Sequence, residues 1–249
     1  MRTPGVLLMV LGLAVTTTLG WADEAQKRLV GYWPFEESDG MKLADASGSG
    51  HDGQILNDSR GVKRISGRRG GAIEFSGGDG KTPNQAGCIT LPGFDPVDWS
   101  KGMTVELWLE LTKLDRPATY ELVSNTKSDR GPGWRFMIAW QSLCLRSGEG
   151  GSGKTWGAGT EPSLTQLRTG EWYHLAGTYD GSVFRVYVDG VLAAQSEANL
   201  GLTRGDATLD VGAYGHGYAY GLNGVVDDLR LYNYPRSPAE IIRDARLGD

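Results

Sequence analysis

The stretch GEWYHLAGTYDGSVFRVYVDGVLAAQ, residues 170–195, decides the fold class of this chain. Two Asp-Gly pairs, at 180–181 and 189–190, divide it into three short runs rich in Val, Tyr and Leu. Asp-Gly between such runs is a strong signal for a tight hairpin turn. The stretch therefore predicts a three-stranded antiparallel meander. The expected strands cover 172–179, 183–188 and 191–194.

The same pattern extends over most of the chain, which contains 38 glycines. Short apolar and β-branched runs bounded by Asp-Gly or Asn-Gly turns are typical of an all-β domain. Two glycine- and serine-rich segments, 45–61 and 147–165, are expected to be exposed loops. Further strands are expected at 29–35, 71–76, 87–91, 103–112, 119–124, 133–140, 143–146, 207–211 and 222–232.

One helix is expected near the C-terminus. Ser237 suits the N-cap, Pro238 the first helical position, and Glu240 the third. The expected packing residues of this helix are Ile241, Ile242 and Ala245.

The N-terminal segment predicts export. Arg2 precedes an apolar run from Val6 to Val15, and small residues at 20 and 22 suit cleavage after Ala22, so residues 1–22 fit a secretory signal. A retained anchor is the alternative, although the run is too short for a membrane span. The mature chain is then secreted or periplasmic, with no membrane insertion. Loss of Arg2 moves its formal charge from -5 to -6, which argues against nucleic acid as a partner.

Two cysteines, Cys88 and Cys144, raise the question of a disulfide bond. An exported protein matures in an oxidising compartment, where two cysteines can pair. The alternative is two separate buried thiols. Two cysteines and three scattered histidines show no zinc-site spacing.

Five stretches in the same order resemble the laminin G-like, concanavalin A-like jelly-roll domains of secreted bacterial proteins. They are LVGYWPFEESDG…LADASGSGHDGQI, GRRGGAIEFSGGDG, GMTVELWLEL, GEWYHLAGTYDGSVFRVYVDGVL and LNGVVDDLRLYNYPRSPAEI. The resemblance implies one β-sandwich domain of two antiparallel sheets over residues 29–246, with the first and last strands as neighbours. It also implies a binding or adhesion module, often for carbohydrate, and in many members a structural calcium ion.

The calcium expectation concerns Asp227, Asp45 and Glu36. In a regular strand Asp227 shares a face with Leu229 and Leu231, so a core position for its carboxylate requires a partner. The resemblance to laminarinase-type hydrolases implies that Asp227 supplies a calcium ligand, with Asp45 second and Glu36 weaker. The alternative is that Asp227 and Asp45 accept backbone N–H groups. Asp228 is expected on a solvated face in an ion pair of little energetic weight.

Aromatic residues in glycine-rich segments are the candidate ligand contacts. Aromatic rings can stack on the apolar faces of sugars. The alternative is that these rings fold back over the ends of the sandwich. The candidate residues are Trp134, Trp156, Tyr214, Tyr218 and Tyr220.

The sequence favours binding over catalysis. Glu106 and Glu110 on one strand lie ~13 Å apart, which exceeds the spacing of about 5–9.5 Å in glycosidase carboxylate pairs. The pattern E-x-D-x-x-E of laminarinase-type enzymes is absent from the chain. His174 is expected to pack, without a nucleophile beside it. We therefore expect a non-enzymatic module for a glycan or cell-surface partner. The alternatives are a structural or protein-interaction domain, or a divergent glycoside hydrolase or lyase.

Overall fold

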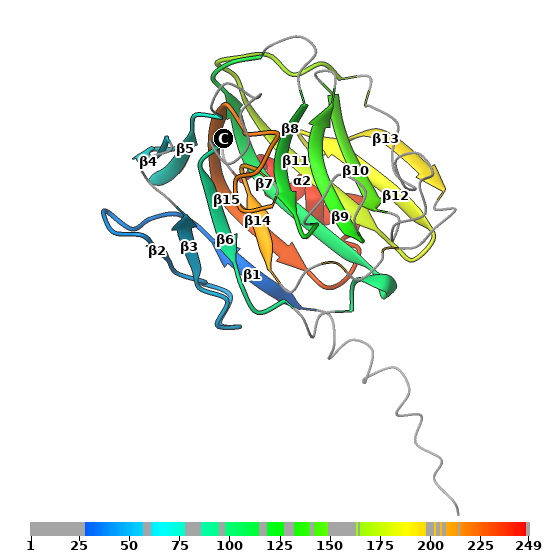
Figure 1. Cartoon of the computed structure of the whole chain (residues 1–249). Coiled ribbons are helices and arrows are strands. Elements are labelled where there is room, and N and C mark those ends of the chain that lie inside the picture. Colours follow the sequence, from blue (N-terminus) through cyan, green and yellow to red (C-terminus); the bar gives the residue numbers. More distant parts are fainter. Residues whose placement is uncertain are drawn as a thin grey trace, which may run out of the picture.

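The stretch that predicts the fold class forms the expected meander. Its strands are β11 (Trp172–Tyr179), β12 (Val183–Val188) and β13 (Val191–Glu197), paired antiparallel in chain order. They belong to a computed structural model in which two antiparallel sheets enclose an apolar core (Figure 1). The structure describes residues 28–56, 61–77, 86–94, 98–114, 119–126, 132–139, 142–148, 163, 165–197, 202, 205, 208–213 and 215–247.

Sheet A contains the meander and also the first and last described strands, β1 and β15. Its strand order is β13-β12-β11-β7-β15-β5-β4, and β1 pairs with the second half of β15. The first and last strands are therefore neighbours, as expected. The additional strands are β1 (Leu29–Trp33), β4 (Val62–Ser66), β5 (Gly71–Phe75), β7 (Met103–Leu111) and β15 (Gly224–Tyr232).

Sheet B forms the second layer, in the order β10-β9-β8-β14-β6-β3-β2. Its strands present alternate side chains to the core, as in β9, where Trp134, Phe136 and Ile138 are fully buried. Its strands are β2 (Lys42–Leu43), β3 (Gly53–Leu56), β6 (Cys88–Leu91), β8 (Thr119–Ser124), β9 (Gly133–Ala139), β10 (Ser142–Gly148) and β14 (Leu209–Val211).

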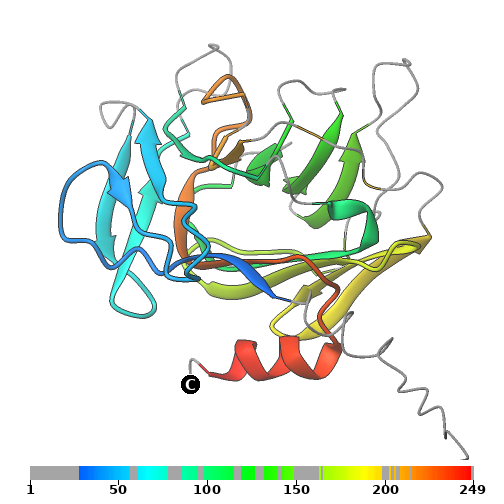
Figure 2. The ribbon, with the colours of Figure 1, turned by 90° about the horizontal axis from the view of Figure 1, so that it is seen from below.

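Different elements cover the outer faces of the two sheets. Figure 2 shows the helix α2 (Pro238–Arg246) lying against the outer side of sheet A, away from sheet B. The segment 212–223, drawn in orange, rises on the opposite side of the molecule, over the outer face of sheet B. The sandwich therefore has one outer face with a helix and one with a loop.

The C-terminal helix begins as predicted. Ser237 is the N-cap and its hydroxyl accepts the N–H of Glu240, while the Glu240 carboxylate accepts the N–H of Ser237. This reciprocal pair is a capping box. Ile241 and Ala245 are buried as expected, whereas Ile242 is half-buried.

Three short strands were not predicted. β2, β3 and β4 lie within or beside segments that the sequence assigns to loops. β3 occupies part of the expected loop 45–61, because its backbone pairs with β6 even though its side chains alternate only briefly. Backbone pairing in a sheet thus creates strands where the local sequence gives a weak signal.

The predicted secretory signal, residues 1–22, lies outside the described residues. Within the described ranges, no helix is both long enough and apolar enough to cross a membrane.

Candidate functional site

A polar row crosses the outer face of sheet B. Registered pairs connect Thr90 to Asp210, Asp210 to Ser124, Ser124 to Arg135, and Arg135 to Arg146. Paired residues of adjacent strands share a face, so these five side chains stand on the side opposite the apolar core. They belong to β6, β14, β8, β9 and β10 in that order. We call these five residues the polar row.

A buried ion pair lies at the centre of this face. A β-bulge between Glu121 and Val123 places Glu121 on the outer side beside Arg135. The Arg135 guanidinium donates to both Glu121 oxygens, with Nη2–Oε2 at 2.6 Å and Nε–Oε1 at 3.1 Å. Both side chains are buried. This geometry is the bidentate arrangement that suits arginine and carboxylate, and it fixes both groups in place.

The segment 212–223, which we call the aromatic loop, crosses above the polar row. The N–H of Glu121 donates to the Tyr220 carbonyl at 2.9 Å, and the N–H of Leu222 donates to the Gly212 carbonyl at 2.7 Å. Gly217 has φ +90°, and a Cβ there would lie 2.5 Å from the Ala86 carbonyl oxygen, so only glycine fits. The loop is therefore fastened to sheet B at several points.

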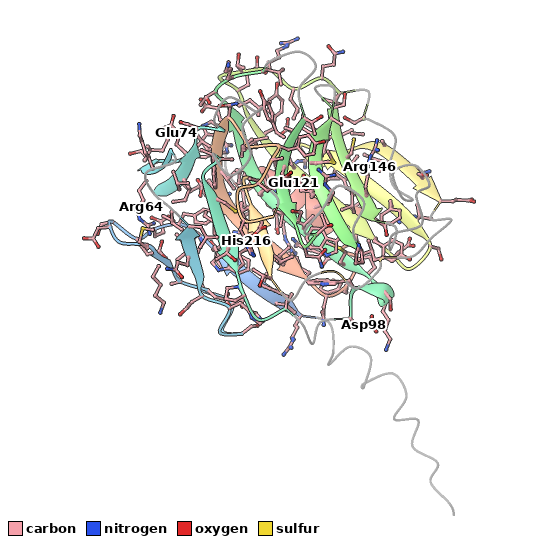
Figure 3. All side chains as sticks on the ribbon, in the orientation of Figure 1. Arg64, Glu74, Asp98, Glu121, Arg146 and His216 are labelled. Carbon is pink, nitrogen blue, oxygen red and sulfur yellow. The ribbon has the colours of Figure 1, made fainter. Side chains whose placement is uncertain are left out.

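His216 is held by Asp210 of β14. The Asp210 carboxylate accepts the His216 backbone N–H at 2.7 Å and lies 2.9 Å from His216 Nδ1. The Asp210 side chain is 6% exposed, whereas that of His216 is 49% exposed. Figure 3 shows His216, Glu121 and Arg146 over the strands of sheet B. His216 therefore joins the buried polar row to the solvent-facing surface.

The two tyrosines of the loop occupy different environments. Tyr218 is 46% exposed, one of few large apolar side chains that remain so open in the described part of the chain. Tyr220 is half-buried, and its ring lies 5.2 Å from the Arg135 guanidinium carbon. His216 and Tyr220 both have positive φ, +59° and +55°, which non-glycine residues rarely adopt. Such strain requires support from the surrounding structure and is common at binding sites.

The predicted ligand contacts are only partly brought together. Tyr218 and Tyr220 lie in the aromatic loop, whereas Trp156 and Tyr214 lie outside the described residues. The expectation of an exposed loop position for Trp134 was wrong. Trp134 is the second residue of β9, is fully buried, and contacts Trp99 edge-on at 5.9 Å. The glycine directly before it, Gly133, is the first residue of this core strand.

Sequence reasoning missed the polar groups of this face. Asp210, Arg135 and Glu121 were not singled out, because each is a lone polar residue in an apolar run. Alternation within the strands was the available signal for Asp210 and Arg135, since it places both away from the core. The β-bulge interrupts the alternation after Glu121. Their mutual proximity depends on strand order, which the local sequence does not specify.

The expected core position of Asp227 was also wrong. In β15 the register shifts between Asp227 and Arg230, because one extra residue forms a β-bulge there: residues 228 and 229 lie opposite the single residue Leu107. Asp227 lies opposite Trp108 on the outer face of sheet A, while Leu229 and Leu231 enter the core. Asp228, which lies within the bulge, has a positive φ of +53°. The two-residue alternation on which the prediction rested is interrupted at this point.

Asp227 is nevertheless fully buried. Its Oδ2 accepts the N–H of Arg69 at 2.9 Å, and its Oδ1 accepts no hydrogen bond within the described structure. Burial raises the pKa of Asp227 from 3.8 to about 6, with the charges of Asp228 and Glu36 adding to the effect. The incompletely satisfied carboxylate is costly in its ionised form.

Asp228 differs from its expected solvated position. Its side chain is 5% exposed, with Oδ1 accepting the Tyr32 hydroxyl at 2.7 Å and Oδ2 accepting Arg69 Nη1 at 3.2 Å. Arg230 lies 3.3 Å from Oδ1. Asp228 therefore joins the bulge to the first strand and to the turn before β5.

Asp45 and Glu36 both accept hydrogen bonds from backbone N–H groups. The Asp45 carboxylate accepts three backbone N–H groups, those of Tyr32, Ser47 and His51, which is the alternative role expected for it. These bonds lower the pKa of Asp45 against the opposing effect of burial. Glu36 accepts the N–H of Gly71 at 3.1 Å. Calcium takes six to eight oxygens, and the described residues contain no cluster of three metal-ligating side chains.

The predicted Cys88–Cys144 disulfide was wrong. Cys88 lies in β6 and Cys144 in β10, with β9, β8 and β14 between them in the same sheet. At ~4.8 Å per strand step the two cysteines are about 19 Å apart, far beyond the span of a disulfide. Both are buried and neither is oxidised.

The comparisons with known proteins agree with the fold. The profile of the concanavalin A-like lectin/glucanases superfamily matches residues 83–242. Domain 4 of AbnA, a GH43 extracellular arabinanase from Geobacillus stearothermophilus in complex with arabinotriose, superposes with a TM-score of 0.67 at 22% identity. That match covers 89% of this chain and 100% of the domain.

Two toxin structures share the same fold at lower identity. The binding domain of Paraclostridial Mosquitocidal Protein 1 has a TM-score of 0.65 at 16% identity, covering 88% of this chain and 52% of its own. A structure of botulinum neurotoxin type C, whose cell entry depends upon interaction with two ganglioside molecules, has a TM-score of 0.66 at 11% identity. It covers 92% of this chain and 53% of its own, so this chain spans about half of either toxin chain. A search of curated proteins gave no match.

Proposed function

Because this chain belongs to the concanavalin A-like lectin/glucanases superfamily, we propose that it is a secreted, non-enzymatic module that binds a glycan on the outer face of sheet B. The ligand then lies against the aromatic loop, which crosses above the polar row. In support, the solved structures of this fold include an arabinotriose complex and a toxin that interacts with gangliosides. Likeness at this level of identity supports the fold, and the choice of face rests on the residues.

The observation that carries the proposal is the exposed pair His216 and Tyr218. An aromatic ring left 46% exposed on a strained, well-anchored loop contributes little to the core. Tyrosine offers an apolar face for stacking and a hydroxyl for hydrogen bonding, which suits the mixed surface of a sugar ring. Beneath the loop, Arg135 and Glu121 are held rigidly by one another, which limits the ordering cost of binding.

A glycan array probed with the purified exported protein tests the proposal. We expect a restricted set of bound oligosaccharides, with affinity reduced about tenfold or more in Tyr218→Ala. Val191→Ala is the matched control, because Val191 is 69% exposed at the edge of sheet A, far from the loop. Unchanged affinity in Tyr218→Ala contradicts the assignment of this face.

An array without any bound glycan favours the alternative, a structural or protein-interaction domain of the cell envelope. The location is part of the proposal as well. N-terminal sequencing of the exported protein should give a chain that begins at Asp23, after cleavage behind Ala22.

A divergent hydrolase or lyase is favoured by one observation, the contact of His216 with Asp210. A carboxylate that orients an accessible imidazole is a common arrangement for a general base. Incubation of the bound oligosaccharide with the protein should leave it intact if the module is non-enzymatic. Release of new reducing ends or unsaturated products, lost in His216→Ala, would instead establish catalysis.

The calcium ion remains a proposal for the neighbourhood of Asp227 and Glu36. It is supported by the unsatisfied Asp227 oxygen and by the proximity of the two carboxylates, which raises the pKa of Asp227. The small number of oxygen ligands among the described residues weighs against it. Its role, if bound, is structural, because Asp227 lies on sheet A.

A further inference from the structure

The contact between Asp210 and His216 determines which ring nitrogen carries the proton. An ionised carboxylate can only accept hydrogen bonds, and Asp210 Oδ1 lies 2.9 Å from His216 Nδ1. The hydrogen between the two atoms is therefore the one that Nδ1 donates to the carboxylate oxygen. His216 therefore carries its hydrogen on Nδ1, and Nε2 of the neutral ring is an unprotonated acceptor.

The surrounding backbone holds the ring in this orientation. Asp210 Oδ2 also accepts the His216 N–H at 2.7 Å, so one carboxylate fixes both the backbone and the ring. Gly215 and Gly217 flank His216 with φ of +60° and +90°. Because Asp210 is buried and His216 is half exposed, the Nδ1 edge faces the sheet and the Nε2 edge faces away from it.

We propose that His216 Nε2 accepts a hydrogen bond from a hydroxyl group of the bound glycan, and that Asp210 is the positioning residue that fixes this tautomer. This inference rests on the proposed function and assigns the chemistry of the same face. Tyr218, two residues further along the loop, supplies the ring on which the sugar stacks. The ligand is a polyhydroxylated ring that offers a hydroxyl donor next to an apolar face.

The tautomer is tested without ligand, by long-range 1H–15N NMR of the full-length protein labelled at histidine. The His216 signals should show a protonated Nδ1 and an unprotonated Nε2 at neutral pH. In Asp210→Asn the new amide can donate to Nδ1, and the proton should move to Nε2. Asp180→Asn, in a turn of sheet A, is the matched control and should leave the tautomer unchanged. A wild-type ring protonated on Nε2 overturns the inference.

The contact is tested with an oligosaccharide identified on the glycan array. We expect His216→Ala and Asp210→Asn each to weaken binding about tenfold, with unchanged melting temperature as the check on folding. His216→Gln should retain more affinity than His216→Ala, because its amide oxygen can accept in place of Nε2. Glycan binding that is equally strong in all three variants overturns this inference and leaves the proposed function standing. An array without bound glycan overturns the proposed function and the contact together, whatever the NMR shows.

Discussion

The two outer faces of the sandwich carry similar residues and use them differently. On sheet A, Arg236 Nη1 donates to Glu106 Oε1 at 2.8 Å and also to Asp244 of α2, and all three side chains are nearly inaccessible. Ile241 of the helix packs on Ala176 and Tyr187 of the sheet. On sheet B, the aromatic loop leaves Tyr218 and His216 open to solvent.

The contrast shows that charged and aromatic residues alone do not identify a binding face. Trp108, Glu106 and His174 were plausible site residues on one strand pair. In the structure Trp108 and His174 contact edge-on at 5.3 Å, and all three are buried. The outer face of sheet A is covered by α2 through an apolar contact and ion pairs, so its residues serve the fold. The outer face of sheet B, covered by a glycine-rich loop with exposed rings, is the face on which we propose that a ligand binds.

The largest expected effect is the loss of the helix attachment. Arg236→Ala leaves Glu106 and Asp244 buried without their cation, and removal of one partner from a buried ion pair costs about 3 to 5 kcal/mol. Urea unfolding followed by tryptophan fluorescence measures the loss. Glycan affinity of the folded fraction should not change.

Arg243→Ala is the control for that comparison. Arg243 is on the same helix and contacts Asp244 at 3.4 Å, but its side chain is 61% exposed. We expect a loss below about 1 kcal/mol, as for a surface ion pair. Equal losses in the two variants would show that the buried network is not what fastens α2.

The next largest effect is a gain in stability rather than a loss, and it is expected from Asp227→Asn. Its pKa of about 6 in the folded state exceeds the ordinary 3.8, so the folded state binds the proton more tightly. The protonated Asp227 carboxyl therefore stabilises the folded state. This stabilisation is complete below about pH 4 and is lost as the pH rises through 6. At pH 7.5 the ionised form costs at most about 3 kcal/mol, and we expect Asp227→Asn to be more stable than wild type in EDTA by part of that amount.

Adding calcium to the same stability comparison tests the calcium proposal. If an ion binds near Asp227, millimolar calcium raises the melting temperature of the wild type and leaves that of Asp227→Asn unchanged. A wild-type melting temperature that does not respond to calcium or EDTA removes the calcium proposal. Asp45→Asn is a poor substitute in this test, because Asp45 also fixes its own loop through three N–H groups.

A smaller effect is expected from the helix cap. Ser237→Ala removes the hydroxyl that accepts the Glu240 N–H and should cost about 1 kcal/mol. Ser182→Ala, at an exposed turn where only the backbone of Ser182 is bonded, should stay within about 0.5 kcal/mol of wild type. A Ser237 variant as stable as the Ser182 variant would show that α2 is held by its ion pairs alone.

The smallest effect is the response to reducing agent. Because three strands lie between Cys88 and Cys144, dithiothreitol should leave the melting temperature unchanged. Thiol titration should detect both cysteines after unfolding and neither before, because both are buried. A melting temperature that falls on reduction contradicts the strand order of sheet B.

Local signals in the sequence were sufficient to predict the meander and the capping box at Ser237. Both depend on residues that are adjacent in the chain, such as Asp189-Gly190 and the Ser-x-x-Glu spacing. The β-bulges at Glu121 and Asp227 were not predictable in this way, because each depends on the register of two strands far apart in sequence. Because the prediction from the sequence did not include the bulge in β15, it placed Asp227 on the wrong face of that strand.

The bulge in β15 also governs when the molecule can finish folding. β5 pairs with residues 224–226 of this strand and β1 with residues 229–232, so the bulge lies where one neighbour gives way to the other. Tyr32 and Asp228, which bond across this junction, are 196 residues apart. Within the described strands β1 pairs only with β15. β1, the first described strand, thus has no partner in a sheet until β15, the last described strand, has been synthesised.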